Sequence, residues 1–208
     1  MHGYTEEGKN RQTVIFWLTV ISIILGVGIT YGLNVLIEFI NKKIEIKIFI
    51  LCITLIFGVS ASGIFGLIYW MFDKFFWKIK IFRNHDLSGK YQCHGISKDK
   101  SQKEKDEFDA IITIKQTWTK ISIHLDAKQS FSDSFMASLS VNGIGDIRLD
   151  YSYKNSTKHT NKDMVSSHTG TANLIFAADI RGKYYNQPDD RMRYGELVLI
   201  KEGKNNAV

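Results

Sequence analysis

A set of polar and aromatic residues in the second half of this 208-residue chain has the chemistry of a site for an anionic ligand with flat rings. Arginine guanidinium groups match phosphate oxygens in a two-pronged geometry, and aromatic or guanidinium planes stack on bases. Serine hydroxyls and a histidine ring add hydrogen-bonding partners. The candidate ligand-binding residues are Ser130, Ser132, Tyr151, Tyr153, His168, Tyr184, Arg191 and Arg193.

The sequence carries no arrangement of residues typical of an enzyme. It lacks a His-Glu-x-x-His zinc motif, a Gly-x-Ser-x-Gly nucleophile motif, a phosphate-binding loop and a Cys-x-x-Cys pair. Its histidines are scattered rather than spaced as converging metal ligands. We therefore predict that the protein is not an enzyme and has no catalytic residue, no metal site and no cofactor.

The candidate residues lie within a region whose apolar residues alternate with polar ones, which is the period of β-strands rather than helices. Connections between the strands are mostly short, as in the NGIG sequence at 142–145. Sequential strands without intervening helices favour an eight-stranded up-and-down antiparallel β-barrel, whose interior holds packed side chains or one small ligand. The expected strands are 88–96, 107–117, 120–126, 134–141, 146–154, 166–178, 180–186 and 191–201.

The alternation also predicts which side chains point into the barrel. The inward face is apolar in most strands, as at Ile112 and Ile114, and the same parity places Phe135 inside. Extended along each strand, this parity turns His168, Tyr184, Arg191 and Arg193 inward as well, beside Tyr151 and Tyr153. Ser130 and Ser132 lie in the connection at 127–134, which reaches the same end of the barrel. Because antiparallel strands alternate in direction, these residues should share one rim, opposite the rim where the chain enters from its N-terminal half.

Two uncharged apolar segments precede the barrel, at 13–37 and 48–72, and each has 25 residues. Crossing the hydrocarbon core of a bilayer takes roughly 20 residues, so each segment is long enough to span it. The short connection makes them a transmembrane hairpin. Six basic residues flank the hairpin on the side of its termini, against three in its loop, which places both termini and the barrel in the cytoplasm.

Small residues in both spans are spaced for close helix packing in lipid. Gly28 and Gly32 form a Gly-x-x-x-Gly pair, and Gly58, Ser62 and Gly66 continue the same spacing in the second span. Such residues let helix backbones approach closely. The spacing fits packing of the two spans on each other, and it also fits packing between protomers.

Charge and cysteine content support this division of the chain. The expected parts are a cytoplasmic tail at 1–12, the hairpin at 13–72, a linker at 73–85 and the barrel at 86–208. The net charge of +6 is concentrated in the first 85 residues rather than in a basic stripe, so we predict no DNA or RNA partner. The two cysteines, Cys52 and Cys93, fall in different parts and are not expected to pair.

Seven short sequences in this order resemble those of one protein family. They are LSGKY at 87–91, IKQTWTKISIHL at 114–125, SFSDS at 130–134, LDYSYKN at 149–155, HTGTANL at 168–174, GKYYN at 182–186 and RMRYGELVL at 191–199. The chain thereby resembles the bacterial two-transmembrane, β-strand-rich effectors of cyclic-oligonucleotide-based anti-phage signalling. In its first strand, Tyr91 stands where a Trp is expected.

The resemblance implies a mechanism. A partner nucleotidyltransferase makes a cyclic dinucleotide or oligonucleotide during infection, and the cytosolic barrel binds this messenger as its activating ligand. The membrane-anchored protomers then oligomerise, disrupt the bilayer of the inner membrane and kill the infected cell. Two spans are too few to enclose a pore in a monomer, so permeabilisation requires such assembly.

Other functions remain compatible with the residues alone. A membrane-anchored carrier of a lipid or another small hydrophobic molecule would use the barrel as lipocalins do, and the apolar interior favours it. A toxin that acts without a signal would need the barrel only as a scaffold. A membrane enzyme is the alternative with the least support.

Overall fold

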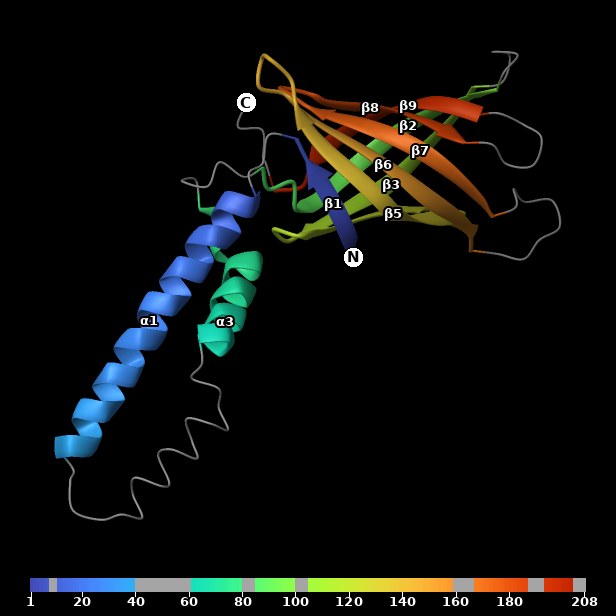
Figure 1. The fold of residues 1–208 in the computed structure, drawn as a ribbon. Helices are drawn as coiled ribbons and strands as arrows, with labels where there is room; N and C mark the ends of the chain where they lie inside the picture. The colour runs from blue at the N-terminus through green and yellow to red at the C-terminus, as the bar shows by residue number, and fades with distance from the viewer. Residues whose placement is uncertain are drawn as a thin grey trace. The chain divides into compact units, whose positions relative to one another are not determined.

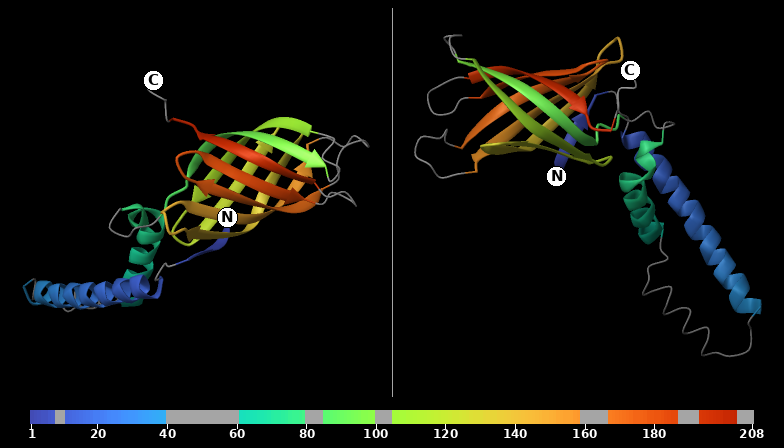
Figure 2. Two further views of the ribbon diagram at one scale, coloured as in Figure 1. Left: turned by 90° about the horizontal axis from the view of Figure 1, so that it is seen from above. Right: turned by 180° about the vertical axis from the view of Figure 1, so that it is seen from behind.

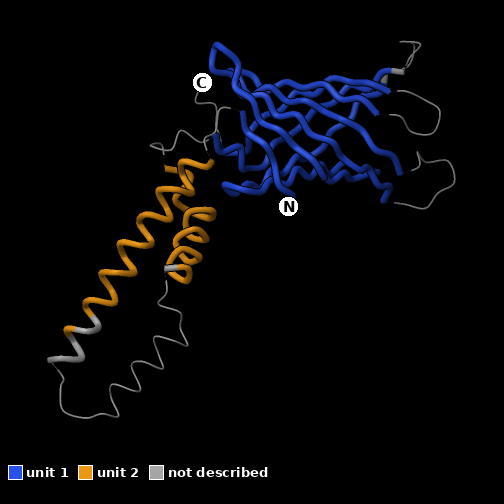
Figure 3. The backbone as a smooth tube through the Cα atoms, in the orientation of Figure 1, with its two compact units in different colours: residues 1–8, 80–208 blue, residues 9–79 orange. Residues whose placement is uncertain are grey.

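A computed structural model describes residues 1–7, 11–39, 61–79, 85–99, 105–158, 167–186 and 193–203. The chain divides into two compact units, which are drawn in different colours in Figure 3. One unit combines residues 1–8 with residues 80–208, and the other consists of residues 9–79. The first unit is built from strands and the second from helices.

The helical unit contains α1 (Arg11–Phe39), α3 (Ala61–Lys74) and a short 3-10 helix, η1 (Phe76–Lys78), which follow one another in Figure 1. Among the described helices, the segment Arg11–Gly32 of α1 is long and apolar enough to cross a membrane. Most of its large apolar side chains are exposed, for example Ile24 and Val27. An exposed apolar surface of this kind suits a lipid environment.

The buried stripe of α1 differs from the pair of glycines singled out by the sequence pattern. Leu18, Ser22 and Gly26, which are four residues apart, are buried, and the Ser22 hydroxyl donates a hydrogen bond to the Leu18 carbonyl at 2.6 Å. Gly28 and Gly32 are exposed, and no atom of the described residues would lie within 4 Å of a Cβ there. Ser62 and Gly66 on α3 are also exposed, and Gly58 lies outside the described residues.

The other unit is a sheet of nine strands, and the prediction of a strand-rich part joined to an apolar N-terminal segment is confirmed. Figures 1 and 2 show the strands curving around a common interior. The strands are β1 (His2–Glu6), β2 (Gly89–Asp99), β3 (Lys105–Gln116), β4 (Lys120–Ala127), β5 (Ser130–Val141), β6 (Ile147–Thr157), β7 (His168–Phe176), β8 (Ile180–Asn186) and β9 (Arg193–Lys201).

The sheet closes on itself in the order β1-β4-β3-β2-β9-β8-β7-β6-β5. Strands β2 to β9 pair antiparallel with their sequence neighbours, and β9 returns to pair with β2. The ninth strand, β1, comes from the segment that was expected to be a cytoplasmic tail. It lies between β4 and β5, antiparallel to β4 and parallel to β5. The described part of the chain therefore contains nine strands, one more than the eight that were expected.

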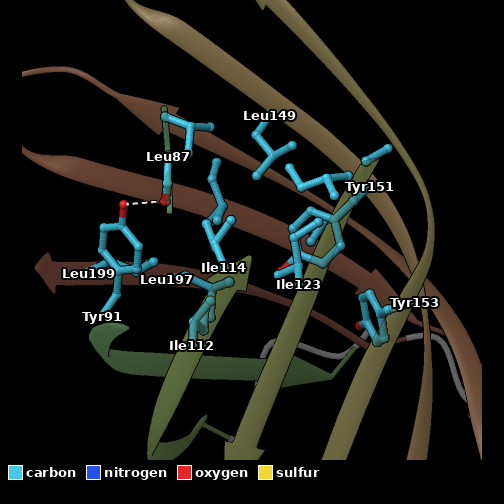
Figure 4. Packing of buried hydrophobic residues seen from close by; sticks show 14 of the residues in the cluster. Leu87, Tyr91, Ile112, Ile114, Ile123, Leu149, Tyr151, Tyr153, Leu197 and Leu199 are labelled. Carbon is cyan, nitrogen blue, oxygen red and sulfur yellow. Dashed lines mark hydrogen bonds between the residues drawn. The ribbon is translucent and has the colours of Figure 1, made fainter. Parts of the chain in front are cut away.

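The interior of the barrel is packed with the side chains that alternation placed there. Ile112, Ile114, Leu149 and Leu174 are almost fully buried, and Figure 4 shows several of these side chains converging from different strands. Burying each such aliphatic side chain contributes roughly 1.5–3 kcal/mol, so this apolar cluster is the main source of the barrel's stability.

The predicted inward position of Phe135 is wrong. The register of β5 against β6 shifts between Ser134 and Met136, which marks a β-bulge. A bulge inserts one extra residue and changes the face on which the following side chains lie. Phe135 is consequently 52% exposed, whereas Ser132 before the bulge and Ala137 after it are both buried.

A buried glutamine fastens three segments of the chain at the rim where β2 begins. The Gln116 amide nitrogen donates to the Tyr4 hydroxyl and to the His85 carbonyl, each at 3.0 Å. Its amide oxygen accepts a hydrogen bond from the Leu87 backbone N–H at 2.9 Å. Gln116 thus joins β1, β3 and the segment that leads into β2, so both connections to the helical unit depend on one side chain.

Replacing Gln116 with Ala should lower the free energy of unfolding of the barrel by about 3 kcal/mol, because it leaves the buried Leu87 N–H and Tyr4 hydroxyl without this partner. Urea titration of the full-length protein in detergent micelles, followed by the strand signal in circular dichroism, measures the effect. Lys115→Ala, at the exposed neighbouring position of β3, is the control. Equal unfolding midpoints for the two variants would contradict the role of Gln116.

Candidate functional site

A cavity of about 740 Å³ opens at the barrel rim opposite the one where β1 and the segment before β2 leave the sheet. The ends of β4, β6 and β8 and the beginnings of β5, β7 and β9 meet there, because antiparallel strands alternate in direction. Pockets for small ligands have volumes of about 300–1,000 Å³. The cavity is therefore large enough for one ligand of that class.

The structure brings the described candidate residues together at this cavity. Arg191 lies outside the described residues, so its side chain is not placed. Tyr151, Tyr153 and Tyr184 are largely buried, and His168 and Arg193 are partly exposed. The candidates that line the cavity are Ser130, Ser132, Tyr151, Tyr153, His168, Tyr184 and Arg193.

Glycines on neighbouring strands set the positions of the cavity's aromatic rings. Tyr153 is paired across strands with Gly170, and Tyr184 is paired with Gly195. A Cβ at Gly170 would lie 2.5 Å from Cζ of Tyr153, and one at Gly195 would lie 2.4 Å from Cε1 of Tyr184. Each ring therefore covers the backbone of a glycine, where any larger residue would displace it. Phe108 covers Gly95 in the same way.

Sequence reasoning missed several residues of the cavity. Asn155 and Asn186 line it, and each follows a predicted tyrosine by two residues on the same face of its strand. Extending the alternation by one more step would have found both. Phe108, whose ring centroid lies 6.2 Å from that of Tyr184, has the inward parity of Ala110 and could have been found in the same way.

Opposite charges meet at the cavity mouth. The Arg193 guanidinium lies 3.8 Å from the Asp106 carboxylate, and the Arg193 side chain is 26% exposed. Lys128 and His168 also line the cavity. An anionic ligand would find partners in these groups, and it would compete with Asp106 for Arg193. The amide nitrogen of Asn186 donates to Nε2 of His168 at 3.0 Å, which orients the imidazole ring.

The turn between β4 and β5 forms part of the rim and is held from outside by Lys158. The Lys158 ammonium donates to the Ala127 carbonyl at 2.7 Å and forms an ion pair with Asp126. This neighbouring ammonium, through its hydrogen bond, lowers the pKa of the Asp126 carboxyl. The Lys158 backbone N–H donates to the Gln129 carbonyl at 3.0 Å, so the turn has a defined position beside the cavity.

Burial keeps the cavity tyrosines and the nearby thiol neutral. It raises the pKa of Tyr151, with smaller contributions from Tyr153 and Cys93, and it also raises the pKa of Tyr153 and of Tyr184. Burial, followed by the charge of Asp109, raises the pKa of the Cys93 thiol to about 12. The tyrosines can therefore present ring faces and neutral hydroxyls to a ligand, but they are poorly suited to act as bases.

Comparison with known sequences matches both units of the chain. A family profile described as "Cap15, TM helices" matches residues 12–78, and one described as "Cap15, cyclic dinucleotide receptor domain" matches residues 82–201. The CD-NTase-associated protein 15 of Yersinia aleksiciae is 32% identical over 170 residues, which cover 78% of this chain and 76% of that protein. The chain belongs to the Cap15 family.

Membership of the Cap15 family confirms the resemblance to membrane effectors of cyclic-oligonucleotide-based anti-phage signalling. The match to the receptor domain includes β2 to β9 and therefore every described side chain of the cavity. It does not include β1, which precedes both Cap15 matches in the sequence. The protein is thus a membrane effector whose strand-rich part is a receptor for cyclic nucleotides.

The raised pKa values predict that the barrel loses stability as the pH rises above about 9. The unfolded chain releases the Cys93 and Tyr151 protons near their ordinary pKa values of about 9 and 10, whereas the folded barrel retains them. The stabilisation is therefore complete below about pH 9 and is lost as the pH approaches 12.

Denaturant titrations of the full-length protein at about pH 8, 9.5 and 11 measure this loss. Tyr151→Phe should make the fall in unfolding free energy less steep, because one of the retained protons is no longer present. Tyr185→Phe removes a hydroxyl from an exposed position and should follow the wild-type curve. Identical pH dependence for Tyr151→Phe and wild type would contradict the assignment.

Proposed function

We propose that the cavity at the rim formed by the ends of β4, β6 and β8 binds a cyclic dinucleotide. The observation that carries this proposal is the convergence of seven residues, chosen for nucleotide chemistry from the sequence, on one cavity within the receptor segment. Arg193, with Arg191, supplies charge for the phosphates. The rings of Tyr153, Tyr184 and Phe108 offer flat surfaces for the bases.

Binding of the ligand has to change the ion pair between Arg193 and Asp106. Arg193 is close to Asp106 in the structure, so a phosphate must displace that carboxylate or share the guanidinium with it. Charge-assisted hydrogen bonds to phosphate are stronger than neutral ones and can compensate for this exchange. His168 and the hydroxyl of Ser132 complete the polar lining around the phosphates.

Binding is proposed to drive assembly of the protomers in the inner membrane and its disruption. The chain would cross the membrane twice, at 13–37 and 48–72, with both termini and the barrel in the cytoplasm. The exposed Gly28, Gly32, Ser62 and Gly66 support contacts between protomers, because these small residues leave the helix backbones open to a neighbour. A nucleotidyltransferase would act on the protein only through the messenger that it makes.

A carrier of lipids or other hydrophobic molecules is a weaker explanation of the same barrel. Its apolar interior is filled by side chains such as Leu139, Leu149 and Leu174, each fully buried. The cavity lies at the rim and is lined by apolar side chains such as Leu125 and Leu197 and also by hydroxyl, amide, imidazole and charged groups. Those groups suit a polar anionic ligand better than an acyl chain.

Replacing Arg193 with Ala should weaken binding of the cyclic dinucleotide about tenfold to a hundredfold, because a charge-assisted contact contributes about 1.5–3 kcal/mol. Calorimetric titration of the full-length protein in micelles with cyclic di-AMP, cyclic di-GMP and cyclic GMP-AMP measures the affinity. Arg181→Ala is the matched control, because Arg181 lies on the outside near the other rim, paired with Asp179. Wild-type affinity in Arg193→Ala would remove this residue from the site.

Replacing Gly28 and Gly32 with Leu should reduce ligand-induced oligomers severalfold in crosslinking experiments and leave ligand affinity unchanged. The added side chains would keep neighbouring helices apart at positions that are exposed in the protomer. Val27→Leu with Tyr31→Leu, which are exposed and four residues apart on the same helix, is the control pair. Oligomers as abundant in the glycine variant as in this control would contradict the packing role.

A further inference from the structure

The N-terminal strand β1 occupies a slot between two strands that separate toward one rim. β4 and β5 pair directly at three positions, from His124 with Asp133 to Asp126 with Phe131. Beyond these pairs, β1 lies between the two strands. It pairs with Lys120 and Ile121 of β4 and with Ala137 to Leu139 of β5. Without β1, both strands would present unpaired backbone groups along this stretch, as open sheet edges do.

The slot recognises β1 through side chains as well as backbone. Tyr4 is 4% exposed in the apolar core, and its hydroxyl accepts a hydrogen bond from Gln116 at 3.0 Å. On the outer face, the Thr5 hydroxyl donates to the Ser138 hydroxyl at 3.0 Å. The Glu7 backbone N–H donates to the Leu139 carbonyl at 2.9 Å. The slot is therefore specific for a short strand with an aromatic residue at its centre.

β1 is also separable from the rest of the barrel. It has five residues, and only residues 7–10 join it to α1, which belongs to the other compact unit. Among the described strands, it makes the one parallel pairing. The contacts that hold it come from the slot, from Gln116 of β3 and, through Glu6, from His85. The same contacts would form with an identical strand from a second copy of the chain.

The slot is linked to the ligand cavity through the part of β5 that precedes the bulge. Ser132 lines the cavity, and two residues later the Ser134 hydroxyl lies 2.8 Å from Nε2 of His2 in β1. Nδ1 of His2 faces the Gly3 carbonyl at 3.0 Å and must donate to it, so in a neutral ring Nε2 accepts from Ser134. The same Ser134 oxygen accepts from the Ile123 backbone N–H at 2.9 Å. A ligand that moves Ser132 therefore acts directly on the residues that hold the tip of β1.

We propose that the slot between β4 and β5 accepts β1 of a second copy of this chain, so that strand exchange links the protomers when ligand is bound. This inference rests on the proposed function of the cavity. Each chain has one donor strand and one slot. A chain that gives its strand to a neighbour leaves its own slot open to a third chain, so the contact is head-to-tail and can continue through many copies. Confinement to a membrane raises the effective concentration of neighbouring strands.

The free-energy requirement for this exchange is small. The contacts made by an exchanged strand are those of the resident strand, so the two arrangements differ mainly in the entropy of association. A ligand shifts such an equilibrium only by its difference in affinity for the two arrangements. The contact from the cavity through Ser132 and Ser134 to His2 gives the ligand a means of making that difference.

Two variants, each with one added cysteine, test the exchange directly. Thr5→Cys and Ser138→Cys, each with Cys52→Ser and a different tag, are mixed as full-length chains in liposomes and oxidised with and without a cyclic dinucleotide. Cys93 is buried and its thiol stays protonated, so it should not compete. A disulfide between the two kinds of chain, increased at least tenfold by ligand, is expected. Ligand-dependent leakage of the liposomes without this disulfide would overturn the exchange and leave the receptor function intact.

A chain with both substitutions provides the complementary test. Partners in adjacent strands are close enough for a disulfide, and the two hydroxyls are in contact. The oxidised chain should bind ligand with wild-type affinity but cause at least tenfold less leakage, and a reductant should restore the leakage. Ser152→Cys with Thr171→Cys joins β6 to β7, which need not separate, and is the control.

These results separate the two hypotheses. Full leakage from the oxidised Thr5–Ser138 chain would overturn strand exchange, whatever the oligomeric state. Loss of ligand binding in every variant and in the wild type would instead overturn the receptor site, and with it the ligand dependence of the exchange.

Discussion

Closure of the sheet is the constraint on which the rest of the barrel depends. An antiparallel sheet that failed to close would leave two rows of backbone groups unpaired, in a domain without a disulfide among its described residues. Here β4 and β5 remain paired only near the cavity, and the N-terminal strand completes the wall between them. The chain thus uses residues from both sides of its helical unit to build one barrel.

This closure also connects the barrel to the helical unit at two points. β1 leads toward α1, and the segment before β2 returns from α3, with Gln116 hydrogen-bonded to both connections. A buried amide whose partners come from both connections fixes their positions relative to β3, because any movement leaves a polar group unpaired. Changes in the barrel wall can therefore reach both connections through a few residues.

The alternation of apolar and polar residues was enough to predict most of the barrel and of its cavity. It placed Tyr151, Tyr153 and Tyr184 inside and at one rim because strand parity and direction depend only on local sequence. It failed for Phe135, because one extra residue in a bulge reverses the parity and leaves no clear mark in the sequence. It also missed β1, since HGYTE is too short to show a period and its partners are more than 100 residues away.

The central claim is that a cyclic dinucleotide binds at the rim opposite the membrane connections. Hydrogen–deuterium exchange of the full-length protein in micelles, with and without saturating cyclic dinucleotide, tests it most directly. Bound ligand should slow exchange at the turn between β4 and β5, at the end of β6 and at the start of β7. Protection confined to the other rim, around Leu87 and the turn between β7 and β8, would contradict it.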